Sequence, residues 1–276
     1  MSKNSFFNYF FHALYLFNAM GFCSNVLSNN VENYIVVNKK NVIHKFVPFD
    51  ERTDNFIKYV FPNWENETFD VFDLVKDSQG IAIDLGAWIG TTAIWLAKNF
   101  YHVVAVEPDR VSLICLKQNL EASECQNTSI CKRPIAHTNQ NVIFGPLFSA
   151  LNESTSAILK EHSYTIETIT LKQILDDYVY TNDAIKNHKI AFIKCDIEGG
   201  EEDIIEDLLH FAYNNKTKVY LSFHLSWWKS KKITDFENLF KSFKTNCPEP
   251  NVSLYIRQNP FTSILFEPRN DDEIYN

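Results

Sequence analysis

The 276-residue sequence has only seven glycines, and it lacks several motifs that would assign it to a common class. No GxGxxG run is present, which argues against a nucleotide-dependent oxidoreductase. The six cysteines form neither a CxxC pair nor a zinc-like spacing with histidine, so we expect no zinc site. No Pro-, Gly- or Ser-rich linker and no internal repeat divides the chain.

Long basic runs are also absent. The formal net charge is −8 and the sequence pI is about 5.5, and the small cluster of Lys229, Lys231 and Lys232 is typical of a solvated loop. Because nucleic-acid-binding proteins usually carry a basic face, we expect no nucleic-acid partner. The chain is 45% hydrophobic with 23 Phe, which is enough for one large domain or two small ones.

The strongest apolar run is FFNYFFHALYLFNAMGFC, residues 6–23. Its composition allows a signal peptide or a short membrane anchor. However, Asn4, Asn8 and His12 would share one face of a helix, which a membrane-spanning helix seldom places in lipid. We therefore favour an amphipathic helix that covers the domain or makes peripheral membrane contact. A cytoplasmic location is favoured, with membrane association or the secretory pathway as alternatives.

The segment before the main pattern is short and mixed. Residues 34–46 contain two strand-like runs around a polar turn and predict a hairpin or two short strands. Residues 61–77 predict a helix that Asn63 would cap. We divide the chain into an N-terminal extension with an apolar helix and small strands, residues 1–60, and a main domain, residues 61–276.

From residue 80 onward, apolar strand patterns alternate with helical patterns, which predicts an α/β fold with a mostly parallel sheet and helices on both faces. The predicted strands are 81–85, 102–107, 128–133, 142–144, 190–196, 219–225, 253–256 and 262–266. The predicted helices are 91–100, 111–122, 170–178, 201–212 and 235–244. The last two strands are joined by a short turn and should therefore be antiparallel.

DLGAWIGTT, residues 84–92, follows the first of these strands. Gly86 permits a tight turn or close approach of the backbone to a ligand, and Gly90 opens a helix whose free N–H groups face the same crevice. Asp84 would repel a pyrophosphate but suits a cationic ligand, and Glu107 at the end of the next strand can accept ribose hydroxyls. A ligand with a ribose, no phosphate and a positive centre fits S-adenosylmethionine.

The glycines support this position for the site. Five of them are predicted at strand-to-helix corners, where open α/β sheets bind ligands. They are Gly80, Gly86, Gly90, Gly199 and Gly200.

A second acidic motif, FIKCDIEGGEEDII, covers residues 192–205. Glu201, Glu202 and Asp203 fall in the first turn of a predicted helix, where acids stabilise the positive end of the helix dipole by ~0.3–1 kcal/mol each. Asp196 has no such local use, because it ends a strand beside the crevice. Glu198 lies between Asp196 and the helix, and either explanation fits it.

His224 ends the neighbouring strand, where a histidine oriented by a carboxylate could remove a proton from an acceptor hydroxyl. Trp227 and Trp228 follow it and could stack on a sugar or close the core. Asp196, Glu198 and His224 could also hold Mg²⁺ against an acceptor hydroxyl, but their spacing matches no dedicated metal motif, so we assign no metal ligands and keep a divalent metal as an option.

Four blocks occur in the order found in a known family. WENET (64–68), IDLGAWIGTTAIWLA, VVAVEPD (103–109) and FIKCDIEGGEEDII resemble the FkbM family of class I S-adenosylmethionine-dependent methyltransferases, and ETITLKQIL (167–175) resembles its usual lead-in to the fourth strand. The resemblance covers residues from about 60 to 225. It implies a Rossmann-like, seven-stranded sheet with an antiparallel last strand.

The resemblance also implies a function. Members are mostly O-methyltransferases of sugars, lipids or polyketides, so residues 61–276 become a methyltransferase domain with a small-molecule or glycan acceptor. The residues that would bind the cofactor are Asp84, Gly86, Ala87, Gly90, Thr91 and Glu107. The residues that would carry catalysis are Asp196, Glu198 and His224. The alternative is a non-catalytic binding or scaffold protein that has kept the fold.

Overall fold

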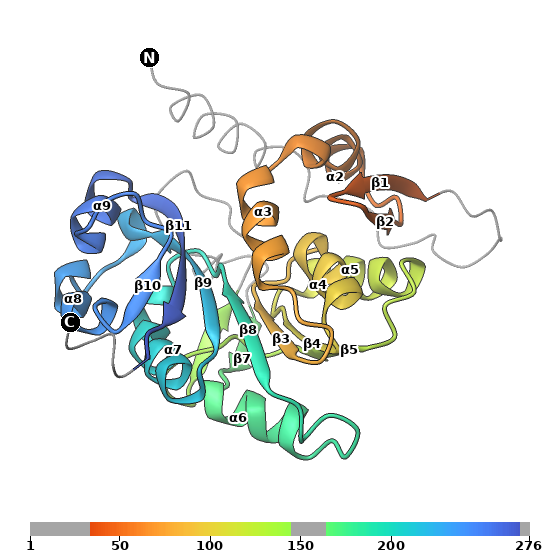
Figure 1. The fold of residues 1–276 in the computed structure, drawn as a ribbon. Coiled ribbons are helices and arrows are strands. Elements are labelled where there is room, and N and C mark those ends of the chain that lie inside the picture. Colours follow the sequence, from red (N-terminus) through yellow and green to blue (C-terminus); the bar gives the residue numbers. More distant parts are fainter. Residues whose placement is uncertain (1–33, 145–163, 271–276) are drawn as a thin grey trace.

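The computed structural model describes residues 34–144 and 164–270 (Figure 1). Its centre is a seven-stranded sheet with the order β10-β11-β9-β8-β3-β4-β5. The strands are β3 (Ile81–Leu85), β4 (His102–Val106), β5 (Thr128–Cys131), β8 (Ile190–Cys195), β9 (Lys218–His224), β10 (Phe243–Thr245) and β11 (Phe261–Pro268). β11 runs antiparallel to both neighbours, and the other pairs are parallel. The predicted fold class is confirmed.

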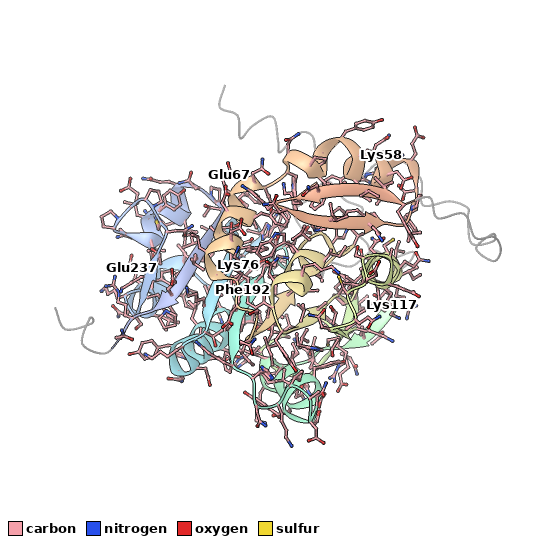
Figure 2. All side chains as sticks on the ribbon, turned by 45° about the vertical axis from the view of Figure 1, so that its right-hand side comes forward. Lys58, Glu67, Lys76, Lys117, Phe192 and Glu237 are labelled. Atoms are coloured by element: carbon pink, nitrogen blue, oxygen red, sulfur yellow. The ribbon has the colours of Figure 1, made fainter. Side chains whose placement is uncertain are left out.

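Helices cover both faces of the sheet because its strands are apolar on both sides (Figure 1). One face packs against α3 (Asn66–Val75), α4 (Thr91–Asn99) and α5 (Arg110–Ala122). The other packs against α6 (Leu171–Leu175), α7 (Glu201–Asn215), α8 (Glu237–Phe240) and α9 (Val252–Gln258). Side chains alternate between the two cores. Ala82 and Phe192 lie in the first core, whereas Ile83 lies in the second. Figure 2 labels Phe192.

Two small two-stranded sheets flank the large one. β1 (Ile35–Lys39) and β2 (Val42–Phe46) form the predicted hairpin, whose turn residues Lys40 and Asn41 both have positive φ, as a tight hairpin turn requires. The hairpin packs on the α4 side of the sheet, next to α2 (Glu51–Asn55) in the chain. β6 (Asn141–Phe144) pairs with β7 (Tyr164–Glu167), a strand that the sequence pattern did not predict.

The C-terminal region corrects two predictions. Residues 253–256 lie in α9 and not in a strand, because Asn251 caps a helix in which Ser253 and Ile256 are buried three residues apart. The antiparallel partners of β11 are therefore β9 and β10, and not a strand at 253–256. The helix predicted at 235–244 ends early: a 3₁₀ turn and the short α8 are followed by β10.

The helix predicted at 61–77 is also interrupted. A 3₁₀ turn, Phe61–Asn63, is separated from α3 by Trp64 and Glu65. The N-cap of α3 is Glu65, with left-handed backbone angles, and not Asn63 as predicted. Gly80 lies immediately before β3, at the amino end of the sheet, so it does not belong with the other corner glycines.

The apolar segment at residues 6–23 lies outside the described residues, and its peripheral membrane contact stays a prediction. Among residues 34–144 and 164–270, no helix has the length and apolar character needed to cross a membrane. Cys115 and Cys195, predicted as small buried apolar side chains, are buried and unpaired.

Candidate active site

The corner after β3 joins three strands at their carboxyl ends. The N–H groups of Gly86 and Ala87 both donate to the carbonyl of Val106 at the end of β4, and the N–H of Asp196 donates to the carbonyl of Leu85. Gly86 has φ +82, and a Cβ there would lie 2.0 Å from the carbonyl oxygen of Asp196. Only glycine fits this position, because both its backbone angle and its close contact exclude a side chain.

Asp84 lies beneath this corner and is fully buried. Its Oδ2 accepts a hydrogen bond of 2.7 Å from Thr92, and its Oδ1 lies 3.2 Å from Nζ of Lys194, which also donates to the carbonyl of Gly86. Burial disfavours the charge on Lys194, but Asp84 and Asp196 outweigh it and raise the pKa of the ammonium. The cation beside Asp84 is therefore Lys194, and not the cationic ligand that the sequence suggested.

Glu107 follows β4 and is buried at the same edge of the sheet. Its Oε2 accepts from the N–H of Trp88 and its Oε1 from the N–H of Asp109, both at 2.8 Å. These bonds fix the carboxylate in position and leave one lone pair on each oxygen. Burial raises the pKa of Glu107 to about 8. Trp88 was not singled out from the sequence, yet it has a left-handed φ of 48° and is partly exposed at the corner.

The carboxyl ends of β8 and β9 bring a second set of side chains together. Nε2 of His224 lies 3.6 Å from Oδ1 of Asp196, and Nδ1 of His224 lies 3.0 Å from Oε1 of Glu201. Glu201 is fully buried and also accepts from the N–H groups of Ile197 at 2.9 Å and Gly199 at 2.7 Å. The structure thus brings Asp196 and His224 close together, and it adds Glu201.

The sequence interpretation of Glu201 as a helix-dipole residue was incomplete. It does lie at the first position of α7, but its carboxylate turns back and satisfies the loop before the helix. A sequence signal existed in the GG pair, since a tight turn leaves N–H groups that need an acceptor. The contact with His224 joins residues 23 positions apart and has no local signature.

The electrostatics of the site centre on His224. Burial opposes its protonation, but Glu201, Asp196 and Glu198 outweigh burial and raise the pKa of His224 to about 9. The imidazole is therefore mostly protonated at neutral pH in the protein without ligands. Glu198, which has a left-handed φ of 52°, is half-buried, and burial together with Asp196 raises its pKa to about 7.

Asp196, Glu201 and His224 each offer a ligand atom within 4.8 Å of the others, so their geometry would accommodate a metal ion. However, Glu201 already accepts hydrogen bonds from Ile197, Gly199 and His224. A metal ion would have to displace the bond that orients the imidazole. The donor set therefore fits a hydrogen-bonded histidine better than a metal centre.

The two tryptophans after β9 have different surroundings. Trp227 stacks on the ring of His224, with centroids 5.0 Å apart and planes 7° apart, and Phe261 contacts both rings edge-on. Trp228 packs against Phe223 and Phe236 in the core. Of the two sequence alternatives, core packing holds for Trp228, whereas Trp227 forms a wall of the site.

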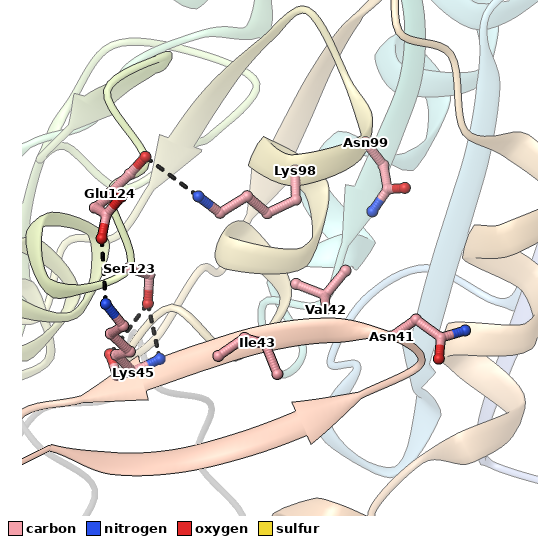
Figure 3. A pocket seen from close by; sticks show the side chains of 8 residues that line it. All are labelled: Asn41, Val42, Ile43, Lys45, Lys98, Asn99, Ser123 and Glu124. Carbon is pink, nitrogen blue, oxygen red and sulfur yellow. Dashed lines mark hydrogen bonds and ion pairs between the residues drawn. The ribbon is translucent and has the colours of Figure 1, made fainter.

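A shallow recess of about 410 Å³ lies elsewhere, between β2 and the ends of α4 and α5 (Figure 3). Its two lysines are already paired, since Lys45 bonds to the carboxylate of Glu124 and Lys98 to the carbonyl of the same residue. None of the residues predicted to bind or react lines it. We do not assign the site to this recess.

The strand order, in which only β11 is antiparallel, is that of a class I methyltransferase fold. The carboxylates of Asp84 and Glu107 lie at the carboxyl ends of β3 and β4. The chain belongs to the FkbM methyltransferase family: the profile of the methyltransferase FkbM domain matches residues 84–246, which is more than half of its length. A search of curated protein sequences gives no significant match.

Three solved structures are similar in fold. An rRNA methylase from Streptococcus thermophilus is 12% identical, with a TM-score of 0.44 over 74% of this chain and 96% of that protein. An FkbM methyltransferase from Methylobacillus flagellatus is 16% identical, with a TM-score of 0.42 over 79% of this chain and 55% of that protein. TYW2 from M. jannaschii, in complex with AdoMet, is 10% identical, with a TM-score of 0.41 over 88% of this chain and 90% of that protein. This chain thus spans about half the length of the Methylobacillus protein.

S-adenosylmethionine is the methyl donor of this class. The corner residues predicted to bind it differ in whether a ligand can reach them. The space beside Gly86 is taken by the carbonyl of Asp196, so this glycine serves the tight corner, and the fixed carboxyl group of Glu107 retains free lone pairs for hydroxyls. In contrast, Asp84, Ala87, Gly90 and Thr91 are buried, and the carbonyl of Thr91 contacts His44. These four residues are buried within the corner, as Glu107 is, whereas Gly86 and Trp88 reach the surface that a ligand can contact.

Proposed function

We propose that the protein is an S-adenosylmethionine-dependent O-methyltransferase that acts on a hydroxyl group of a carbohydrate or glycoconjugate. The observation that carries the proposal is the placement of Asp196 and His224 at neighbouring strand ends, with buried Glu201 bonded to the imidazole. Family membership supports methyl transfer. The imidazole supports an acceptor that must lose a proton, as a hydroxyl does.

When bound, S-adenosylmethionine supplies a methyl group on a positively charged sulfur, which an oxygen can attack in line. Glu201 accepts a hydrogen bond from Nδ1–H of His224 and thereby leaves Nε2 to face the acceptor. The reacting hydroxyl of the acceptor would donate its hydrogen bond to Nε2, and Asp196, close to Nε2, would orient the acceptor by accepting a hydrogen bond from a neighbouring hydroxyl. As the new carbon–oxygen bond forms, Nε2 of His224 takes the hydroxyl proton.

This role sets the pH dependence. With a pKa of about 9, only about 1% of His224 is neutral at pH 7 in the free enzyme. Because the neutral imidazole accepts the proton, kcat/KM should rise with pH until about pH 9. A positively charged ligand beside the imidazole would lower this pKa and increase the reactive fraction.

The test separates cofactor binding from turnover. Calorimetry with S-adenosylmethionine should show binding to the wild type and weaker binding to Glu107→Gln, whose amide cannot keep both bonds that the N–H groups of Trp88 and Asp109 donate. Transfer of a labelled methyl group to a panel of glycans, lipids and small molecules should then show an O-methylated product. His224→Asn should keep cofactor affinity and lose turnover. The matched control is His210→Asn, since His210 is exposed on α7.

Two outcomes would overturn the proposal. A folded protein that does not bind S-adenosylmethionine cannot be a methyltransferase of this class. A protein that binds it and methylates nothing in the panel would instead be a binding or scaffold protein that has kept the fold.

A further inference from the structure

Glu65 stands in a strained position at the start of α3. Its backbone is left-handed, with φ 46° and ψ 47°, which is uncommon for a residue with a side chain. Its carbonyl accepts the N–H groups of Thr68 and Phe69, but its side chain makes no capping bond to the helix backbone. The carboxylate instead accepts a hydrogen bond of 3.3 Å from the hydroxyl of Thr68. The glutamate is thus directed away from the usual role of a helix cap.

A buried lysine holds this conformation in place. Lys39, on β1, is 1% exposed, and its ammonium donates to the carbonyls of Phe61, Pro62 and Trp64 and to the side chain of Asn66. Two of these acceptors, Trp64 and Asn66, flank Glu65 directly in the chain. An ammonium with several acceptors is a rigid anchor for a loop, because each bond is charge-assisted. The hairpin therefore fixes where Glu65 can point.

Glu65 is joined to the active site through α3 and β9. The hydroxyl of Thr68, which bonds to Glu65, lies 3.0 Å from the phenol oxygen of Tyr220. Tyr220 pairs in register with Lys194 on β8, and Nζ of Lys194 lies 3.9 Å from Oδ2 of Asp196. A segment more than 100 residues away in the sequence is thereby brought beside the ends of β8 and β9.

The charges around Glu65 agree with this placement. Burial and the neighbouring Asp196 raise the pKa of Glu65 to about 7, and Lys194, Thr68 and His224 oppose the rise. The side chain nevertheless remains accessible to solvent. A ligand can therefore reach this carboxylate from solvent, although protein atoms crowd around it.

The cations of this region are already committed to carboxylates. Lys194 pairs with Asp84, and His224 pairs with Glu201. The same two cations also face Asp196, so carboxylates outnumber cations here once Glu65 and Glu198 are added, and Asp196 acts electrostatically on both of these glutamates. An anionic acceptor would meet like charges there, whereas a hydroxyl-bearing neutral acceptor would meet hydrogen-bond acceptors.

We propose that Glu65 contacts the methyl acceptor and that, together with Asp196 and Glu198, it selects a neutral, hydroxyl-bearing acceptor over one that carries a carboxylate, sulfate or phosphate. This inference rests on the proposed function, since it concerns the acceptor of the same reaction. It adds a recognition residue from outside the motifs at the strand ends. It also restricts the acceptor class to molecules without a negative charge.

The experiment compares Glu65→Gln with Glu67→Gln, because Glu67 is exposed at the start of α3 (Figure 2). Both variants should keep the melting temperature and the S-adenosylmethionine affinity of the wild type. Methyl transfer is measured with the neutral acceptor from the panel and with its uronic-acid counterpart. In Glu65→Gln, KM for the neutral acceptor should rise about tenfold or more, and the preference over the uronic acid should fall by a similar factor. Glu67→Gln should match the wild type in both quantities.

Equal KM and equal selectivity in the two variants would refute the inference, as would a wild-type preference for the uronic acid. If the wild type binds S-adenosylmethionine but methylates nothing, the proposed function fails while Glu65 can still be tested. In that case an array of neutral and uronate-bearing glycans is probed with labelled protein and S-adenosylhomocysteine. Binding to neutral glycans that Glu65→Gln loses and Glu67→Gln keeps would support the contact. Binding that Glu65→Gln retains, or no binding at all, would refute it.

Discussion

Replacement of Glu201 by glutamine tests the electrostatic reasoning at the site most directly. Glu201 is fully buried, and its carboxylate accepts from the Nδ1–H of His224 and from the N–H groups of Ile197 and Gly199. Glu201→Gln keeps the shape of the side chain and removes its charge. Asp196 and Glu198 remain, but burial of His224 is then opposed by fewer charges, so the pKa of His224 should fall from about 9.

The magnitude follows from the pKa itself. The ordinary pKa of histidine, 6.5, is raised to about 9 in the fold, and this difference corresponds to ~3 kcal/mol in favour of the protonated form. Because the side chain of His224 is only 15% exposed, solvent screens this interaction little. Since the folded pKa lies above the unfolded one, the stabilisation is fully present below pH 6.5 and is lost as the pH rises to about 9.

Two measurements check this prediction. An NMR titration of the histidine rings from pH 5.5 to 10 gives the pKa of His224 in each protein. Denaturant unfolding at pH 6.5 and pH 9.5 gives the change in stability across the window. The difference between wild type and Glu201→Gln should shrink by up to ~3 kcal/mol at the higher pH. Glu206→Gln, an exposed change on the same helix, should leave both quantities unchanged.

The reasoning would be refuted by either of two results. If His224 in the wild type titrates near 6.5, the neighbouring carboxylates only offset the effect of burial and give no net stabilisation of the protonated form. If the pKa of His224 stays near 9 in Glu201→Gln, Asp196 and Glu198 are its source, and Glu201 only supports the loop.

Three further predictions concern the frame of the site. Gly86→Ala should lower stability by roughly 2–5 kcal/mol in denaturant unfolding, because its Cβ would meet the carbonyl of Asp196 at φ +82; Gly200→Ala, at φ −66, is the control, and equal small losses would contradict the argument. Lys39→Met should cost about 2–4 kcal/mol in the same assay, since it leaves several carbonyls without their donor, and an unchanged midpoint would show that the loop is held by packing alone. Exhaustive chelation should leave methyl transfer unchanged, because Glu201 is already committed to hydrogen bonds; activity lost on chelation and restored by Mg²⁺ would place a metal at the site.

The sequence predicted the sheet well where burial is uniform. Runs such as residues 81–85 and 190–195 are buried at every position and apolar except for the paired Asp84 and Lys194, and they lie in strands that helices cover on both faces. The short run at 253–256 misled the prediction, since four apolar or small residues fit a strand and a helix turn equally well. Only the cap provided by Asn251 and the packing against the neighbouring turn make it α9.

The sequence by itself determined where the central strands lie along the chain and the corner at Gly86, because burial patterns and glycine geometry act over a few residues. It also placed Asp196 and His224 at strand ends. The tertiary structure alone decided which charges meet: Lys194 neutralises Asp84, Glu201 binds His224, and Thr68 connects Glu65 to Tyr220. Those partners are 23 to 152 positions apart, apart from the local bond between Glu65 and Thr68. No local pattern encodes them, because side chains this far apart become neighbours only when parallel strands and their helices pack together.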